Sequence, residues 1–259
     1  MRCSEVIRIL QDLSPEEAAL DWDNPGLIAG RMEKDVRKVF VALDATDEVV
    51  SDAVECEADM LLTHHPLIFG SIRKVNSETF VGRRLIELIS HDISYYAMHT
   101  NFDACGMADY AAEIMGLRDC EILEESAVVN GKPEGIGRIG RLPSTQSLEE
   151  CAELVKKRFE IPTVKVFGAL GSPISKVALS PGAGRSMIEP ALAGDVDCII
   201  TGDIDHHTGI DAVAQGLTVI DAGHYGIEKI FIPYMETYLR EKTDLTIICD
   251  KPREPFVVL

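Results

Sequence analysis

The chain has 259 residues, 46% of them hydrophobic, which suffices for one large domain or two domains of ordinary size. Its 25 basic and 43 acidic side chains give a formal net charge of −18 at pH 7. This acidity argues against binding to nucleic acid backbones, and no apolar run approaches the roughly 20 residues that a transmembrane helix needs.

The cysteines and the start of the chain predict a cytoplasmic protein that does not contact membranes. Seven cysteines are scattered without a C-x-x-C pair, and this odd count suits neither a disulfide framework nor a thiolate zinc site. We expect reduced, mainly buried thiols, Cys105 among them. The first 24 residues become acidic quickly and lack the apolar core of a signal peptide.

In the first half of the chain, short β-branched runs alternate with longer amphipathic segments. The predicted strands span 38–43, 60–63 and 94–99, and the predicted helices span 46–57, 81–90 and 108–115. Gly116 is a suitable residue to end the last of these helices. This alternation is typical of α/β architecture, with largely parallel sheets that are buried on both faces.

Asn130 and Gly131 are typical of a β-hairpin turn, and a second α/β unit is expected to begin near them. The predicted strands there span 135–142, 164–169, 176–179, 198–201, 217–221 and 245–249, and the predicted helices span 147–158, 185–193 and 226–240. We therefore expect two α/β lobes. The first comprises residues 1–125 with 223–259, because the last helix and strand are expected to return to it, and the second comprises 126–222.

Metal-competent side chains follow four of the predicted strands, where ligands gather in open α/β sheets. Six of the seven histidines lie at these four strand ends. The residues are His64 and His65, then His99 and Asp103, then Asp203, Asp205, His206 and His207, and finally His224 with Glu228.

The predicted metal ligands are His64, His65, Asp103, His224 and Glu228. His224 and Glu228 are four residues apart after a glycine turn, so a helix would place both side chains on one face. Beyond the strand end, His64 and His65 can turn toward one cavity and serve different ions, while the Glu228 carboxylate can bridge them. The set predicts two divalent ions per chain, about 3.5–4 Å apart.

The chemistry of this ligand set limits which metal ions and which class of substrate are expected. Nitrogen and oxygen donors without thiolate suit zinc, manganese, iron, cobalt or nickel better than calcium. Two divalent ions bring a charge of roughly +4 against roughly −2 from the two carboxylates. This surplus would lower the pKa of a bound water and attract an anionic small-molecule substrate.

Other polar residues have both functional and structural interpretations. His99 either acts in catalysis or orients a ligand, and His206 and His207 either transfer protons or cap a helix. His91, near a helix end, is expected to be structural. The glycine-rich segment 180–186 could bind phosphate but is better explained as a tight strand-to-helix turn. Asp23 and Asn24 either line the cleft or form a polar turn.

Six motifs occur in a fixed order along most of the chain. They are WDNPGL at 22–27, LDAT at 43–46, THHP at 63–66, HTNFD at 99–103, TGD with its following histidines at 201–207, and GHYGIE at 223–228. Together they resemble the Nif-three-like family, whose members are labelled GTP cyclohydrolase 1 type 2 homologs. One departure is Asp203, which stands where many members have Glu, so the role of this carboxylate is undefined.

The resemblance implies two similar α/β lobes with a dinuclear metal cleft between them, and it assigns the metal to the same five ligands. It also implies a ring-shaped homohexamer, and the chain length fits the short form without an inserted domain. The leading hypothesis is a two-metal hydrolase acting on a nucleotide-like substrate, with GTP suggested by the family label. A metal-dependent phosphoesterase would use the same site. A ring-shaped metal-binding or partner-binding scaffold without turnover is the non-enzymatic alternative.

Overall fold

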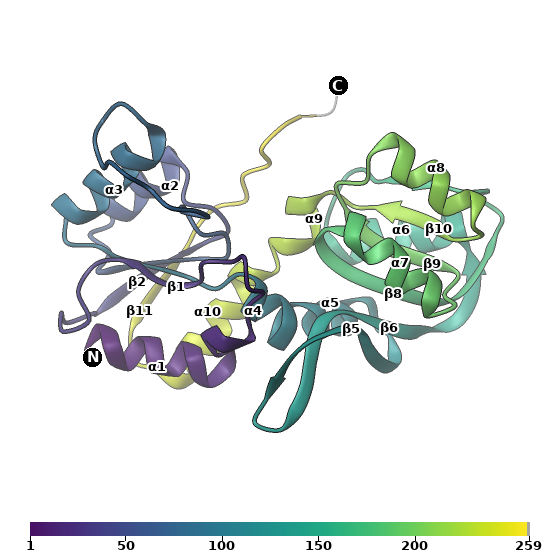
Figure 1. Ribbon diagram of the computed structural model, residues 1–259, viewed down its shortest axis with the longest axis horizontal. Coiled ribbons are helices and arrows are strands. Elements are labelled where there is room, and N and C mark those ends of the chain that lie inside the picture. The colour runs from purple at the N-terminus through teal and green to yellow at the C-terminus, as the bar shows by residue number, and fades with distance from the viewer. Residues whose placement is uncertain (258–259) are drawn as a thin grey trace. The chain divides into compact units, whose positions relative to one another are not determined.

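The computed structural model describes residues 1–257 and shows an α/β protein with two sheets (Figure 1). One compact unit comprises Met1–Phe102 and Phe231–Pro252, and the other comprises Asp103–Ile230 with residues 253–257. These boundaries differ from the expected ones at 125/126 and 222/223. The difference arises because the chain from residue 103 to residue 129 packs on and pairs with the sheet of the second unit.

The sheet of the first unit has four parallel strands and one antiparallel edge strand. Across the sheet the order is β1 (Gly26–Ala29), β4 (Ser94–Ala97), β3 (Met60–Thr63), β2 (Lys38–Ala42) and β11 (Thr246–Cys249). Only β1 runs antiparallel to its neighbour. Because β11 pairs with β2, the predicted return of the last strand to the first unit is confirmed.

Helices cover both faces of this sheet, as Figure 1 shows. Leu61, Tyr95 and other buried residues of one face pack against α2 (Asp47–Glu55) and α3 (Phe80–Ser90). The other face is covered by α1 (Cys3–Leu13) and α10 (Phe231–Lys242), which are joined by a hydrogen bond from the Tyr238 hydroxyl to the Ile9 carbonyl oxygen. Short helical turns η1 (Glu16–Ala18) and α4 (Thr100–Phe102) complete the unit.

The predicted helix at 226–240 is wrong as a single element. The structure has α9 (His224–Glu228) in the second unit and α10 from Phe231 in the first, with Lys229 and Ile230 between them. Pro233 accounts for a new helix start here, because proline lacks a backbone N–H and fits only the first turn of a helix.

The sheet of the second unit is mixed, so largely parallel strands were correctly predicted only for the first unit. Across the sheet the order is β5 (Arg118–Val129), β6 (Lys132–Ser147), β8 (Pro173–Ala183), β9 (Cys198–Gly202), β10 (Thr218–Asp221) and β7 (Lys165–Phe167). Only two of its neighbouring pairs are parallel, β8 with β9 and β9 with β10. The predicted hairpin turn is confirmed, because Asn130 and Gly131 have φ values of 51° and 77° between β5 and β6.

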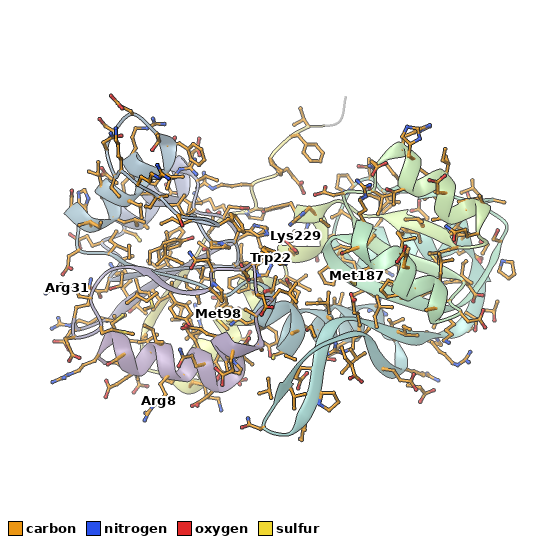
Figure 2. All side chains as sticks on the ribbon, in the orientation of Figure 1. Arg8, Trp22, Arg31, Met98, Met187 and Lys229 are labelled. Carbon is orange, nitrogen blue, oxygen red and sulfur yellow. The ribbon has the colours of Figure 1, made fainter. Side chains whose placement is uncertain are left out.

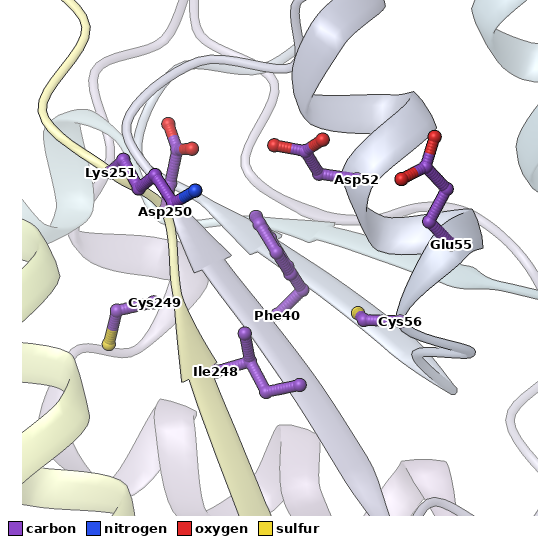
Figure 3. Close-up of a pocket in the computed structure, with 8 residues that line it drawn as sticks. All are labelled: Phe40, Asp52, Glu55, Cys56, Ile248, Cys249, Asp250 and Lys251. Carbon is purple, nitrogen blue, oxygen red and sulfur yellow. The ribbon is translucent and has the colours of Figure 1, made fainter.

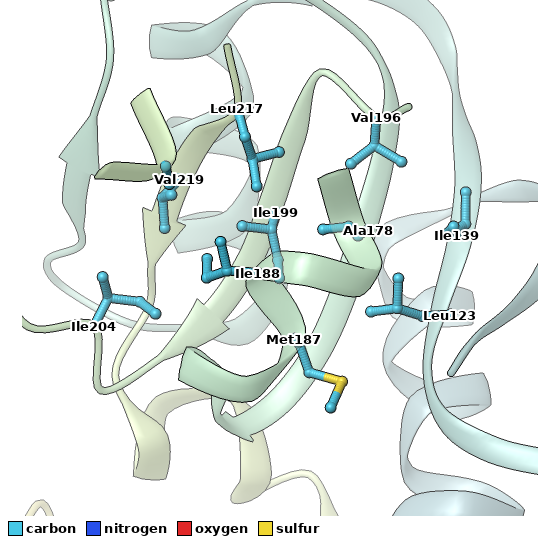
Figure 4. Packing of buried hydrophobic residues seen from close by; sticks show 12 residues of the cluster. Leu123, Ile139, Ala178, Met187, Ile188, Val196, Ile199, Ile204, Leu217 and Val219 are labelled. Atoms are coloured by element: carbon cyan, nitrogen blue, oxygen red, sulfur yellow. The ribbon is translucent and has the colours of Figure 1, made fainter. Parts of the chain in front are cut away.

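Four helices pack on this second sheet. On one face lie α5 (Ala108–Met115), ended by Gly116 as predicted, and α6 (Leu148–Phe159). On the other lie α7 (Ile188–Ala193), preceded by the 3-10 turn η3 (Gly184–Met187), and α8 (His206–Ala214). The core under α7 and α8 is built from aliphatic side chains such as Ile199 and Val219 (Figure 4).

The sequence interpretation omitted α1, β1, β5 and α8. A pattern was present in two of them, because Val6, Ile7 and Leu10 of α1 have helical spacing and β1 is an apolar run. Across residues 1–257, the structure has no helix that combines the length and the apolar composition of a bilayer-crossing segment.

Candidate metal centre

Three histidines follow two neighbouring parallel strands of the first unit. His64 and His65 follow β3, and His99 follows β4. Because β3 and β4 are paired in parallel, their carboxyl ends lie at the same edge of the sheet. One ring nitrogen from each histidine lies within 4.8 Å of the others, so the group can hold a metal ion.

The Nδ1 atoms of His64 and His65 both contact oxygen acceptors. His64 Nδ1 lies 2.7 Å from the Met98 carbonyl oxygen, and His65 Nδ1 lies 2.7 Å from Asp44 Oδ1. A carbonyl or an ionised carboxylate only accepts, so each ring donates from Nδ1 and keeps its lone pair on Nε2. Metal-ligating histidines in proteins have this arrangement, with an oxygen behind the ring that fixes the tautomer.

Asp23 supports His99 in the same way. The buried Asp23 carboxylate accepts hydrogen bonds from His99 Nδ1 at 2.8 Å, from the Thr100 N–H at 3.0 Å and from the Thr100 hydroxyl at 2.6 Å. Burial raises the pKa of Asp23, but these hydrogen bonds outweigh it and hold the pKa at about 2. His99 therefore has the geometry of a metal ligand as well as that of the catalytic or orienting residue predicted from sequence.

In the second unit, His224 lies between two carboxylates. Its Nδ1 is 2.8 Å from Asp203 Oδ2, and its Nε2 is 2.9 Å from Glu228 Oε2. The predicted one-turn spacing of His224 and Glu228 is confirmed in α9, and the Glu228 side chain is buried. Asp203, whose role the sequence left undefined, is the carboxylate behind the His224 ring.

Asp103 and Glu228 bring two carboxylates together. A carboxylate oxygen of each lies within 4.8 Å of the other, and Asp103 begins the π-helical segment η2 (Asp103–Met107). Segments of π-helix are frequent at functional sites. Two carboxylates this close, one of them buried, repel each other unless a cation or a proton lies between them. This donor set therefore suits a divalent ion.

Glycine at position 182 allows the backbone to approach Glu228. Gly182 has a φ of 80°, and a side-chain Cβ there would clash with Glu228 Oε1. A Cβ at Gly184 would clash with the Thr201 side chain. These close approaches explain the glycines of segment 180–186 without a bound phosphate, in agreement with the structural interpretation favoured from sequence.

Asp221 anchors the turn that carries His224, and its place at a strand end is the only sequence signal that could have pointed to it. Its buried carboxylate accepts hydrogen bonds from the Gly223 N–H at 2.9 Å and the Ile204 N–H at 3.0 Å. Lys165 Nζ lies 2.7 Å from the same carboxylate. The chain segments after β9 and β10 are therefore held together beneath His224.

Sequence and structure comparisons place this arrangement in a family. Residues 1–254 match the family model described as Duf34/NIF3 (NGG1p interacting factor 3). The chain belongs to the Duf34/NIF3 family. This confirms the family that the six motifs indicated.

Relatives within the Duf34/NIF3 family match the chain almost end to end. A Clostridium perfringens protein named GTP cyclohydrolase 1 type 2 homolog is 33% identical over 99% of both chains. A Streptococcus pneumoniae protein of the same name is 35% identical over 93% of this chain and 91% of its own length. The crystal structure of a Bacillus cereus protein related to NIF3 superposes with a TM-score of 0.90 at 23% identity, covering 100% and 99% of the two chains.

The remaining histidines of this Duf34/NIF3 chain lie at helix ends. His206 and His207 are exposed in the first turn of α8, where the Asp205 carboxylate caps the helix by accepting from the His207 and Thr208 N–H groups. Their proposed role in proton transfer stays a prediction. His91 is the C-cap of α3, and its Nδ1 lies 2.9 Å from the Glu87 carbonyl oxygen, as expected for a structural residue.

The cysteines and one surface hollow are further features to compare with the candidate ligand positions. All seven cysteines are free thiols as predicted, although only Cys3, Cys151 and Cys198 are fully buried and Cys105 is half-buried. A hollow of about 310 Å³ in the first unit is lined by residues of β2, the end of α2 and the chain around the end of β11 (Figure 3). The candidate ligand histidines of the first unit, His64, His65 and His99, instead follow β3 and β4.

Proposed function

We propose that this chain is a metal-dependent hydrolase that binds two divalent ions and acts on a nucleotide-like substrate. The proposed ligands are His64, His65, Asp103, His224 and Glu228. One observation carries the proposal: His64, His65 and His224, together with His99, each direct Nδ1 at an oxygen acceptor. Metal-ligating histidines in proteins have this arrangement, in which an oxygen behind the ring fixes its orientation.

The carboxylates support two ions rather than one. Glu228 Oε2 is 2.9 Å from His224 Nε2, and a Glu228 carboxylate oxygen is within 4.8 Å of Asp103. A carboxylate with close donors in two directions is suited to bridging a pair of ions. Zinc, manganese, iron, cobalt and nickel all accept this nitrogen and oxygen set.

The chemistry follows from the donors. Divalent ions in such a set act as Lewis acids and lower the pKa of a bound water, as hydrolysis requires. The chain itself holds the ligand rings through Asp44, Asp203 and the Met98 carbonyl. We assign proton transfer to His206 or His207, because both are exposed and an imidazole ring can both accept and donate a proton. The relatives' name makes GTP the first substrate to test.

Metal content is the first test of the proposal. After reconstitution with zinc or manganese and removal of excess metal, we expect about two ions per chain by elemental analysis. Substituting His65→Ala or Glu228→Ala should lower that stoichiometry and abolish hydrolysis. His91→Ala is the matched control, because it removes a histidine whose Nδ1 is also bonded but which caps a helix. A wild-type protein that holds well under one ion per chain would contradict the two-metal proposal.

Substrate turnover is the second test. GTP, other nucleotides and simple phosphoesters are incubated with the reconstituted protein, and the products are separated chromatographically. Turnover of phosphoesters alone would favour the phosphoesterase, and no turnover across the panel would favour the non-enzymatic scaffold. The proposal includes the homohexamer, for which light scattering should give a mass of about six times 28.4 kDa.

A further inference from the structure

Two exposed aromatic rings flank His99 in the first unit. Trp22 is 60% exposed and Phe69 is 52% exposed. Their ring centroids lie 5.8 Å and 5.6 Å from that of His99, and both ring planes are steeply inclined to the imidazole, at 75° and 77°. Single exposed aromatic residues need no explanation, but two beside the same candidate site residue form a local apolar surface.

The backbone that carries Trp22 is fixed on both sides. Asp23 holds His99 and Thr100, as described above, and the Leu20 N–H donates to the Thr100 hydroxyl at 2.9 Å. Asn24 Nδ2 donates to the Ile68 carbonyl oxygen at 2.7 Å. The WDNPGL turn thus carries the Trp22 ring and is hydrogen-bonded to Ile68, the residue before Phe69.

The backbone before Phe69 is fixed as well. The Leu67 N–H donates to the Tyr95 hydroxyl at 2.8 Å, and that hydroxyl donates to the His65 carbonyl oxygen at 3.0 Å. Both aromatic side chains are therefore exposed although their attachment points are held by hydrogen bonds. A surface whose backbone is already ordered binds a ligand at a lower entropic cost.

We propose that Trp22 and Phe69 form a binding site for a planar aromatic ring, namely the base of a nucleotide substrate. The rings supply apolar and π faces, on which any base stacks without a need for sequence-specific hydrogen bonds. Their contact with His99 places the bound base beside the histidine group of the first unit. The inference rests on the proposed function, because it takes the stacked ligand ring to be the base of the nucleotide substrate.

Trp22 provides its own reporter, because it is the only tryptophan of the chain (Figure 2). The probes are guanosine 5′-monophosphate and ribose 5-phosphate, which share the sugar and the phosphate and differ in the base. We expect the nucleotide to quench Trp22 fluorescence with a saturating curve, and ribose 5-phosphate to leave it unchanged. Equal binding of the two probes, measured by equilibrium dialysis, would overturn the inference.

Variants assign the effect to these rings. Phe69→Ala should raise the Kd for guanosine 5′-monophosphate at least about fivefold, since stacking on one aromatic side chain is typically worth that much. Trp22→Ala, followed by equilibrium dialysis, should show a similar loss, and Trp22→Phe a smaller one. The control is Phe80→Ala, which removes a phenyl ring of similar exposure, 55%, from the start of α3. Wild-type affinity in the Phe69→Ala and Trp22→Ala proteins would contradict the proposal.

The binding measurements separate this inference from the proposed function, because they need no turnover and are made with metal-free and metal-loaded protein. Base-dependent quenching without hydrolysis of any substrate would keep the aromatic site and overturn the hydrolase. Hydrolysis of a ring-free phosphoester with the same kcat/KM in the wild-type and Phe69→Ala proteins, combined with no quenching, would keep the hydrolase and overturn the aromatic site.

Discussion

Asp44 Oδ1 lies 2.7 Å from Nδ1 of His65, at the same position beyond the ends of two parallel strands. The register pairs Ala42 of β2 with Thr63 of β3, so residues 44 and 65 continue the same alignment two positions further. The register of β3 with β4 pairs Thr63 with Ala97, which extends the row to His99. One row across three strands thus holds a carboxylate and two candidate histidines.

Removing the Asp44 carboxylate should weaken metal binding. We expect Asp44→Ala to lower zinc affinity about 10- to 100-fold, the usual cost of losing the acceptor behind a ligating histidine. Asp44→Asn should lose less, because its amide oxygen still accepts a hydrogen bond. Affinity is measured by competition with a chromogenic chelator. The control is Asp47→Asn, whose carboxylate pairs with Arg84, and equal affinity in all three variants would refute the supporting role.

Gly182→Ala should impair metal binding by displacing the Glu228 carboxylate. The new Cβ would clash with Glu228 Oε1, so we expect metal binding to fall together with stability. The control is Gly131→Ala in the hairpin turn, because Gly131 has a similar φ of 77° but open space around it. Both variants carry a backbone strain of about 1 kcal/mol. Only the Gly182→Ala protein should lose metal. An equal loss of metal in both variants would show that backbone strain, and not the clash with Glu228, is the cause.

Asp109→Ala should destabilise the protein through Arg138. The Arg138 side chain is only 4% exposed, and its guanidinium donates to both Asp109 oxygens at 2.5 and 2.7 Å. Without Asp109 the buried charge keeps its carbonyl partners and the more distant Glu134 carboxylate at 3.8 Å, but it loses its closest counter-ion. We expect a cost of about 2 kcal/mol after allowance for the exposed Asp109 carboxylate. Urea denaturation measures this. Glu153→Ala, which breaks an exposed pair with Lys156, should cost less than about 0.5 kcal/mol.

Asp205 should make the stability of the folded protein depend on pH in the acidic range. A hydrogen bond from the Thr208 hydroxyl, followed by those from the Thr208 and His207 N–H groups, lowers the pKa of Asp205 to about 2. Because this folded pKa lies below the unfolded one, the stabilisation is fully present above about pH 4 and is lost as pH falls toward 2. Asp205→Asn still caps the helix but does not titrate. Urea midpoints of the two proteins should converge between pH 4 and about 2.5, and parallel pH profiles would exclude this contribution.

Local sequence patterns were enough to predict many of the helices, strands and turns. The strand at Met60–Thr63, the helix ended by Gly116 and the Asn130–Gly131 turn follow from apolar runs and turn residues, which act over a few positions. The helix at 226–240 was wrong, because its apolar spacing continues across a break that lies between two compact units. The long β5 strand was missed, since its many acidic residues hide the pattern of a half-buried strand.

The sequence by itself determined where candidate metal ligands lie along the chain, because histidines and carboxylates cluster after apolar runs and four-residue spacing places His224 beside Glu228. It also carried enough motifs to indicate the family. Only the tertiary structure decided which strand ends are neighbours: β3 lies between β2 and β4, so Asp44, His65 and His99 share one row. The physical reason is that parallel neighbours are joined by crossovers, so strand order and register depend on long-range packing rather than on the residues near each strand.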